Sequence, residues 1–289
     1  MPPEPVPETA EAVPEVSLGP ADDIIVATGL AQRFGARTIF RDVSLSVRRG
    51  EVFVILGGSG CGKSTLMRQL IGLLPPTAGE ITVAGRRITG TDAEAGRQAM
   101  QRGIGVMFQA GALFGSMTLL ENVMLPLEIF TDLPADARAA VARVKLALVG
   151  LGDAAALMPA EISGGMAKRA AIARALALDP PLLFLDEPSA GLDPITSAGL
   201  DQLILDLRHD LGATFVVVTH ELASILAIAD RCLMLDRNAH PDGGGVIATG
   251  DPRMLRDTSA DPVVRAFFHR TVLAATPAAA SPSPAGPLA

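Results

Sequence analysis

The chain reads Gly57-Gly58-Ser59-Gly60-Cys61-Gly62-Lys63-Ser64 directly after an apolar run at residues 52–56 and before a stretch with helical character. This is a complete G-x-x-x-x-G-K-[ST] pattern. Its glycines let successive backbone N–H groups face an anion at a helix N-terminus, while Lys63 supplies charge for the β- and γ-phosphates and Ser64 a hydroxyl for magnesium. A plain Gly-rich turn is the alternative, but the order strand, loop, helix favours a phosphate-binding loop. The expected nucleotide-binding residues here are Gly57, Gly58, Ser59, Gly60, Cys61, Gly62, Lys63, Ser64 and Thr65.

Two further apolar runs, at residues 182–185 and 215–218, resemble the run before the loop. Continuous apolar runs of this length are typical of parallel strands that are covered on both faces. Short strand-like runs alternate with helical stretches along the chain, which predicts an α/β fold. Open parallel sheets bind ligands beyond the carboxyl ends of their strands, so we expect the three strand ends to converge on one site.

Titratable residues stand at two of these expected strand ends. Asp186 and Glu187 follow the run at 182–185, and His220 closes the run at 215–218. Beside a phosphate loop, Asp186 can hold the Mg²⁺ that bridges the phosphates, and Glu187 can orient or deprotonate an attacking water. A lone histidine is more often structural, but the convergence of the strand ends favours a γ-phosphate contact for His220.

Two other residues are candidates on weaker grounds. Gln109 follows a strand-like stretch at 105–108 and opens the helical region, where its amide could reach the metal or the attacking water; an ordinary surface glutamine is the alternative. Phe34 precedes Gly35 on an N-terminal strand and could stack on adenine, a contact that needs only an aromatic face. A simple core position is the alternative for Phe34.

The expected organisation is one domain between two tails. Residues 1–22 are Pro-rich and residues 271–289 are Ala/Pro-rich. With few large apolar residues to offset the entropy of ordering, we expect both tails to be disordered. Residues 23–270 then form the domain, with a mainly helical subdomain at about 110–178 that contains Ala-rich stretches such as residues 135–148. We interpret residues 24–47 and 79–88 as shorter strands that form a small antiparallel sheet.

Composition limits the classes of protein. Hydrophobic residues make up 49% of the chain, but no uninterrupted apolar run reaches the roughly 18 residues that a membrane-spanning helix needs. Residues 1–15 lack the basic and apolar regions of a signal peptide, so a cytosolic chain is expected. Two cysteines provide neither a disulfide framework nor a spaced metal cluster. The net charge of -7 opposes binding to a phosphate backbone, so we expect no nucleic-acid partner.

A second glycine motif makes the interpretation specific. Ile162-Ser163-Gly164-Gly165-Met166 begins an Ala- and Arg-rich helical stretch that runs to about residue 178. Asp186-Glu187-Pro188, the loop at 189–193 and His220 follow in order. These residues resemble the signature, Walker B, D-loop and switch motifs of ABC transporter ATPases, and the resemblance covers residues 24 to about 250. From the residues alone, Ser163 with the amides of Gly164 and Gly165 is a helix N-terminus suited to an anion, and a capped helix without a ligand is the alternative.

The resemblance implies a P-loop NTPase fold: an ABC-type nucleotide-binding domain with a RecA-like core, an antiparallel β subdomain and a helical subdomain. It also implies a head-to-tail dimer of two copies, with ATP and Mg²⁺ between the phosphate loop of one copy and the signature residues of the other. The residues expected to act in ATP hydrolysis are Glu187, His220 and Gln109. Those expected on the metal are Ser64, Gln109 and Asp186, and those expected on ATP from the second copy are Ser163, Gly164 and Gly165.

Departures from the common motif indicate a subfamily. Ile162 stands where leucine is common, and Met166 stands where glutamine is common. Together with residues 108–114, 121–123 and 125–127, and with residues 261–268, they resemble Mla-type ATPases of MCE phospholipid transport systems. Phe268 and His269 depart from the C-terminal pattern of those ATPases. That resemblance implies a transmembrane permease, MCE-type substrate-binding and accessory subunits, and a peripheral location on the cytoplasmic side of the inner membrane.

The segment after Gln109 is where such ATPases receive the coupling helix of their permease. Leu113, Phe114, Met117 and Leu119 are the apolar residues there, and core packing is the alternative for each of them.

Three other functions keep part of this chemistry. An ATPase for an amino-acid importer or a lipoprotein exporter would share every catalytic residue. A soluble ABC ATPase acting on DNA or ribosomes would usually carry coiled-coil insertions, zinc cysteines or a second cassette, and only 54 positions separate Gln109 from Ser163. A phosphate-loop kinase would not need a signature motif.

Overall fold

The computed structural model describes residues 23–90 and 93–271. The strands are β1 (Asp23–Phe34), β2 (Arg37–Arg48), β3 (Val52–Gly57), β4 (Ala78–Val83), β5 (Arg86–Arg87), β6 (Ile104–Met107), β7 (Leu182–Asp186), β8 (Thr214–Val218), β9 (Arg231–His240) and β10 (Gly243–Gly250). The α-helices are α1 (Lys63–Leu70), α2 (Ala93–Gly103), α3 (Leu119–Phe130), α4 (Ala135–Leu148), α5 (Gly164–Ala175), α6 (Pro194–Leu211), α7 (Leu222–Ile228), α8 (Pro252–Thr258) and α9 (Pro262–His269). The tails predicted to be disordered lie outside the described residues, apart from Thr271.

The strands join into one sheet in the order β5-β4-β1-β2-β10-β9-β3-β8-β7-β6. Strands β9, β3, β8, β7 and β6 run parallel to one another, and β5, β4, β1 and β2 are antiparallel neighbours. The predicted α/β class is therefore confirmed, with the three expected strands β3, β8 and β7 side by side. Their carboxyl ends open on the same edge of the sheet.

The N-terminal strands differ from the prediction in length and connection. Residues 24–47 form two 12-residue strands rather than shorter pieces, and β2 joins the core sheet where Phe40 pairs with Gly244 of β10. Irregularities in the β1–β2 register, together with Gly29 at φ 59°, let β1 continue past a point where the apolar alternation breaks. The alternation alone does not reveal such a bulge.

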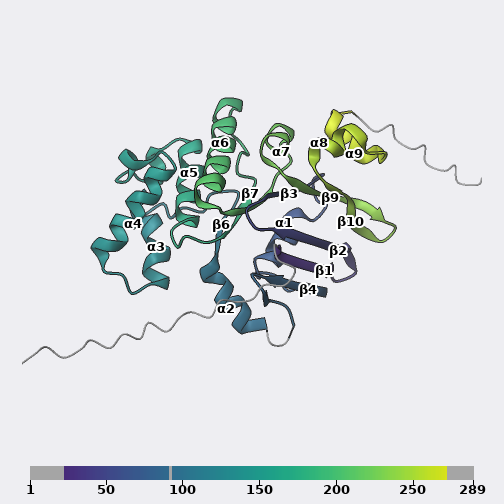
Figure 1. The fold of residues 1–289 in the computed structure, drawn as a ribbon, viewed down its shortest axis with the longest axis horizontal. Helices are drawn as coiled ribbons and strands as arrows, with labels where there is room; N and C mark the ends of the chain where they lie inside the picture. Colours follow the sequence, from purple (N-terminus) through teal and green to yellow (C-terminus); the bar gives the residue numbers. More distant parts are fainter. Residues whose placement is uncertain (1–22, 91–92, 272–289) are drawn as a thin grey trace, which may run out of the picture.

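Both faces of the central strands are covered. Val52, Val54 and Leu56 pack into one apolar cluster, and the alternate residues Phe53 and Ile55 pack into the other. Figure 1 shows α6 and α7 on one side of these strands, with β1, β2 and β4 on the other. Because a fully buried side chain of this size stabilises the fold by about 1.5–3 kcal/mol, a strand covered on both faces is apolar at every position.

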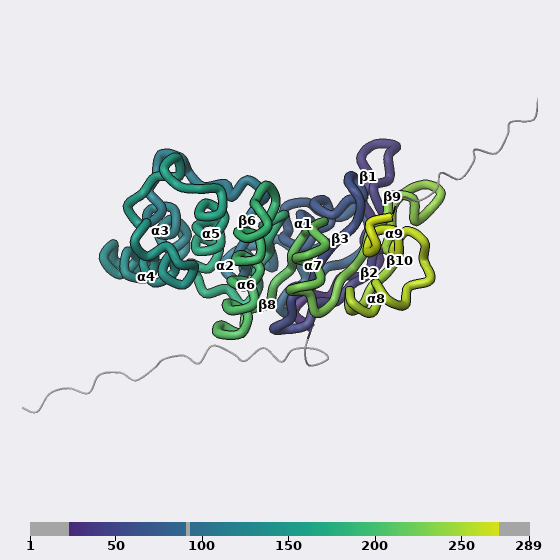
Figure 2. Tube along the Cα trace, turned by 90° about the horizontal axis from the view of Figure 1, so that it is seen from above, coloured from purple at the N-terminus to yellow at the C-terminus, as the bar shows by residue number. Residues whose placement is uncertain are grey.

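The three helices α3, α4 and α5 pack against one another at one end of the molecule. In both ribbon views the hairpins β1–β2 and β9–β10 lie at the opposite end, with β3 and α1 between (Figures 1 and 2). Thr118 begins α3 with a capping box, in which its Oγ1 accepts from the N–H of Glu121 and the Glu121 carboxylate accepts from the N–H of Thr118. Helices α3, α4 and α5 all lie within residues 110–178, the range predicted for the helical subdomain. The exact boundaries of that subdomain and of the domain stay a prediction. Within the described ranges, no helix is both long and apolar enough to cross a membrane.

Candidate nucleotide site

The loop between β3 and α1 has a backbone that only glycine allows at two positions. Gly57 has φ 144°, and a Cβ there would lie 2.2 Å from the backbone oxygen of Leu235 on the neighbouring strand. Gly62 has φ 104°, and a Cβ there would lie 2.8 Å from the Phe40 ring. The chain therefore passes tightly between β9 and β2 before α1 begins at Lys63.

Lys63 turns back over this loop. Its Nζ donates to the backbone oxygens of Gly57 at 2.9 Å and Gly58 at 3.2 Å. Its charge thus lies over the loop that precedes the N-terminus of α1, which suits a phosphate. Cys61 is buried, and burial raises the pKa of its thiol, so the side chain is a neutral packing group. Its backbone N–H donates to the carbonyl oxygen of Gly58 at 3.4 Å, which closes the loop on itself.

The ends of β7 and β8 bring Glu187 and His220 together. The N–H of Glu187 donates to the oxygen of Val218 at 2.8 Å, which aligns the two strand ends. Glu187 has φ 48°, a left-handed conformation that costs a residue with a side chain about 1–3 kcal/mol. Its carboxylate oxygens then lie 2.8 and 2.9 Å from Nδ1 of His220. The strained turn therefore points the carboxylate at the imidazole.

Asp186 lies one residue earlier, where β7 ends. Its Oδ1 is buried and has no hydrogen-bond partner among the described residues. Burial raises the pKa of this carboxyl, and the neighbouring charge of Glu187 raises it further. A buried carboxylate oxygen without a donor is costly unless a cation or water meets it, so this atom has the environment of a metal ligand.

Gln109 follows β6 and reaches the site through its backbone. Its side chain is exposed, and its carbonyl oxygen accepts from Nζ of Lys168, which also donates to the carbonyl oxygen of Glu187 at 3.4 Å. Sequence reasoning missed Lys168 as a site residue. The available signal was a lysine on an otherwise apolar face of an Ala-rich helix, because lysine is almost never fully buried without partners.

Phe34 and the signature residues lie on other elements, at the end of β1 and at the start of α5. Phe34 is 53% exposed at the end of β1, so the alternative of a core position is wrong. Ser163 caps α5, and its Oγ accepts from the N–H of Met166 at 3.2 Å. Both ribbon views place α5 beside α3 and α4, apart from α1 (Figures 1 and 2). The fold thus assembles Lys63, Asp186, Glu187 and His220 along one sheet edge, while Ser163 begins a helix of the helical group.

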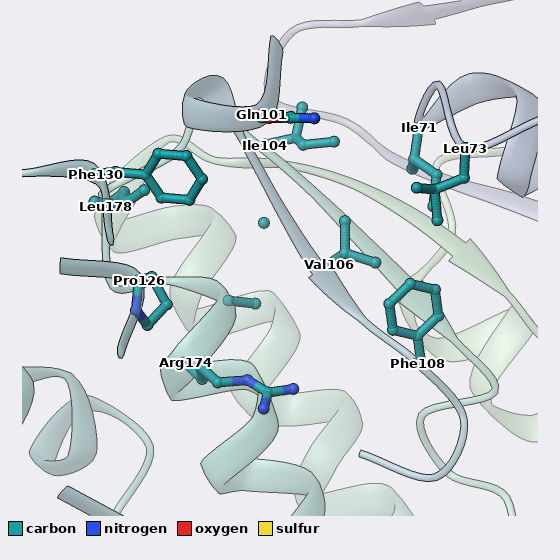
Figure 3. A pocket seen from close by; sticks show the side chains of 12 residues that line it. Ile71, Leu73, Gln101, Ile104, Val106, Phe108, Pro126, Phe130, Arg174 and Leu178 are labelled. Atoms are coloured by element: carbon teal, nitrogen blue, oxygen red, sulfur yellow. The ribbon is translucent and has the colours of Figure 1, made fainter. Parts of the chain in front are cut away.

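An apolar pocket lies between the edge strand β6 and the helical subdomain. Figure 3 shows Ile104, Val106 and Phe108 on one side, with Pro126 and Phe130 of α3 opposite. Of the four apolar residues predicted for docking, Phe114 is 50% exposed and Leu119 is fully buried, so core packing is the correct alternative for Leu119.

Comparison with known proteins agrees with this arrangement. The family model "ABC transporter" matches residues 40–190. The chain is 42% identical to the probable ribonucleotide transport ATP-binding protein mkl of Mycobacterium tuberculosis over 245 residues, which are 85% of this chain and 66% of that protein, slightly under two thirds of its length. It is 44% identical to the intermembrane phospholipid transport system ATP-binding protein MlaF of Escherichia coli K12 over 223 residues, which are 76% of this chain and 82% of that protein.

The methionine import ATP-binding protein MetN of Rhizobium johnstonii is 41% identical over 226 residues, which are 78% of this chain and 62% of that protein. Among solved structures, the dimeric bacterial ABC transporter cassette MJ0796 matches with a TM-score of 0.70 and 31% identity, covering 78% of this chain and 98% of that chain. The chain belongs to the ABC transporter family. The predicted P-loop fold and the resemblance to Mla-type ATPases are confirmed, and the ABC domain binds ATP.

Proposed function

We propose that this chain is the ATP-hydrolysing subunit of a transporter that moves phospholipids between membranes. The observation that carries the catalytic part is the Glu187 carboxylate held against His220 at the strand ends beside the phosphate loop. The phospholipid part rests on the 44% identity to MlaF, whose name states that substrate for the relative.

The chemistry assigned to these residues is in-line hydrolysis. A water oxygen attacks the γ-phosphorus, the bond to the β–γ bridging oxygen breaks, and ADP leaves with that electron pair. Glu187 orients the water and accepts its proton, while His220 holds the Glu187 carboxylate and faces the γ-phosphate. Lys63 balances charge on the β- and γ-phosphates. Gln109 orients the water from the β6 side, and Phe34 offers its exposed ring to adenine.

Mg²⁺ fits the residues at the end of β7. Asp186 supplies a buried carboxylate oxygen that lacks a protein donor, and Ser64 supplies a hydroxyl in the first turn of α1. These two residues with the amide of Gln109 would hold the ion through oxygen atoms, the ligands magnesium prefers. When bound, the ion neutralises charge that develops on the phosphates.

A second copy of the chain completes each ATP site. Ser163 and Gly164 are exposed at the N-terminus of α5, where backbone N–H groups suit an anion. Because α5 lies with α3 and α4, apart from α1, a head-to-tail partner would present Ser163, Gly164 and Gly165 to ATP (Figures 1 and 2). The dimeric state of the MJ0796 cassette supports this pairing.

The apolar pocket beside β6 is the site assigned to the permease. Exposed Phe108 and the neighbouring Phe114 provide apolar surface at the joint between the sheet and the helical subdomain. Through a permease with MCE-type substrate-binding and accessory subunits, the chain would lie on the cytoplasmic side of the inner membrane. An amino-acid importer remains the second candidate, because MetN is 41% identical to this chain.

The first experiment separates these functions. The chain is purified with its genomically adjacent permease in nanodiscs, and ATP turnover is measured with phospholipid or with methionine as candidate substrate. Phospholipid-dependent turnover supports the proposal, and a response to methionine alone overturns its lipid part while leaving ATP hydrolysis in place.

The catalytic assignment is tested in the same preparation with Glu187→Gln. This variant should bind ATP as the unmodified chain does and turn over at least about a hundredfold more slowly, because a general base is worth roughly 10²–10⁴ in rate. ATP binding by equilibrium dialysis and phosphate release are the two measurements. Unchanged phosphate release would remove Glu187 from the mechanism.

A further inference from the structure

Helix α5 contacts the segment after β6 through two cations. Lys168 donates from Nζ to the carbonyl oxygen of Gln109, and Arg174 donates to the carbonyl oxygens of Gly111 at 2.9 Å and Ala112 at 2.7 Å. Gly111 and Ala112 both have positive φ, so this segment makes a tight turn whose carbonyl groups face the helix. The two side chains hold both ends of that turn against α5.

Lys168 also reaches a second element. Its Nζ is 3.4 Å from the carbonyl oxygen of Glu187, and the residue is only 9% exposed. The one ammonium group therefore touches Gln109, two residues after β6, and Glu187, the residue after β7. These two strands are parallel neighbours in the sheet. Both hydrogen-bond partners are backbone carbonyls, and the nearby charges of Glu187 and Asp186 favour the ammonium form that burial opposes.

The contact of Lys168 lies on the same helix as the signature residue Ser163. Ser163 caps the helix five positions before Lys168 and lies on the surface. Under the proposed dimer, Ser163 faces the nucleotide held by the other copy. A rigid helix of 12 residues therefore has its N-terminus at one ATP site and a cation among the catalytic residues of the other ATP site.

We propose that Lys168 is a positioning residue that connects the signature helix of one ATP site to Gln109 and Glu187 of the other. The inference rests on the proposed ATPase function and extends it. When nucleotide draws Ser163 toward the partner copy, α5 moves as a unit, and Lys168 carries the residues after β6 and β7 with it. Hydrolysis at one site then depends on closure at the other.

The test compares Lys168→Met, Lys168→Gln and Lys168→Arg in the permease complex. Methionine keeps the length without the charge, glutamine keeps a donor, and arginine keeps charge and donors. We expect kcat to fall at least tenfold in Lys168→Met while KM for ATP stays within about twofold, because a misplacement of about 1 Å costs up to 10²-fold in rate. Lys168→Arg should recover most of kcat, and the Hill coefficient for ATP should fall toward 1 in Lys168→Met.

Lys145→Met is the matched control. Lys145 is another buried lysine of the helical subdomain, and it pairs with Asp179 away from the strand ends. The Lys145→Met variant should have a lower melting temperature than the unmodified chain, with kcat and the Hill coefficient unchanged. Full kcat in folded Lys168→Met, or no recovery with arginine, overturns the inference. Loss of ATP turnover in Glu187→Gln beside full turnover in Lys168→Met would reject the role of Lys168 and keep the proposed function, whereas full turnover in Glu187→Gln rejects the proposed function itself.

Discussion

The fold disfavours the ionised form of the Asp186 carboxyl. Burial and the charge of Glu187 raise its pKa, so the folded chain holds this proton more tightly than the unfolded chain does. Below pH 3.8, the ordinary pKa, the carboxyl is protonated in both states and its burial does not lower the stability of the fold through charge. As the pH rises through the raised pKa of the folded chain, the carboxyl ionises and the loss of stability becomes complete. Asp186→Asn should therefore raise the melting temperature of the nucleotide-free chain at pH 7.5, with a smaller gain at pH 4.5. The same variant should lose the stabilisation that Mg²⁺ adds to bound ATP. An equal gain at both pH values, measured by thermal denaturation, would show that the charge is not the cause.

The contact between β6 and α5 depends on a residue without a side chain. A Cβ at Gly105 would lie 2.3 Å from the backbone oxygen of Ala175, and neither backbone can move without separating the strand from the helix. Gly105→Ala should therefore destabilise the chain by about 1–3 kcal/mol, the usual cost of overpacking. Urea denaturation measures this value. Gly103→Ala is the control two residues earlier, since a Cβ there meets no atom within 4 Å and alanine favours the end of α2. A Gly105→Ala variant as stable as the Gly103→Ala control would contradict the close packing of β6 on α5.

The whole molecule is elongated, with the phosphate loop near its middle and α5 in the helical group at one end (Figure 2). Under the proposed function, this separation puts the phosphate loop and the signature residues on different parts of the surface, and two copies would meet head to tail to assemble one ATP site. Glu187→Gln with Mg²⁺ and ATP should accumulate as a dimer of about 60 kDa, twice the 29.8 kDa of the chain, because bound ATP holds the two surfaces together until it is hydrolysed. Light scattering after size exclusion measures the mass, and the same variant with ADP should run as a monomer. A monomer in ATP would contradict the proposed pairing.

The phosphate loop and the central strands could be predicted because their signals are local. Strands β3, β7 and β8 are apolar at successive positions because both faces of the sheet are covered. A run of consecutive apolar residues is therefore visible in the sequence itself. Residues 135–148 were recognised as an Ala-rich stretch of the helical region because alanine favours the helix, and α4 spans these residues. The lengths of β1 and β2 were not predicted, because bulges interrupt the alternation by which strands are recognised.

The amino-acid sequence determined the family, the phosphate loop and the identity of the residues at the strand ends, because each depends on the order of neighbouring residues. The tertiary structure determined three further points. It showed that Glu187 faces His220 through a left-handed turn, that Phe34 is exposed, and that Lys168 joins β6 and β7. The contacts connect residues that are 19 to 59 positions apart in the sequence. Neither these contacts nor the exposure of Phe34 can be predicted from neighbouring residues, because both depend on how distant segments pack in the folded chain.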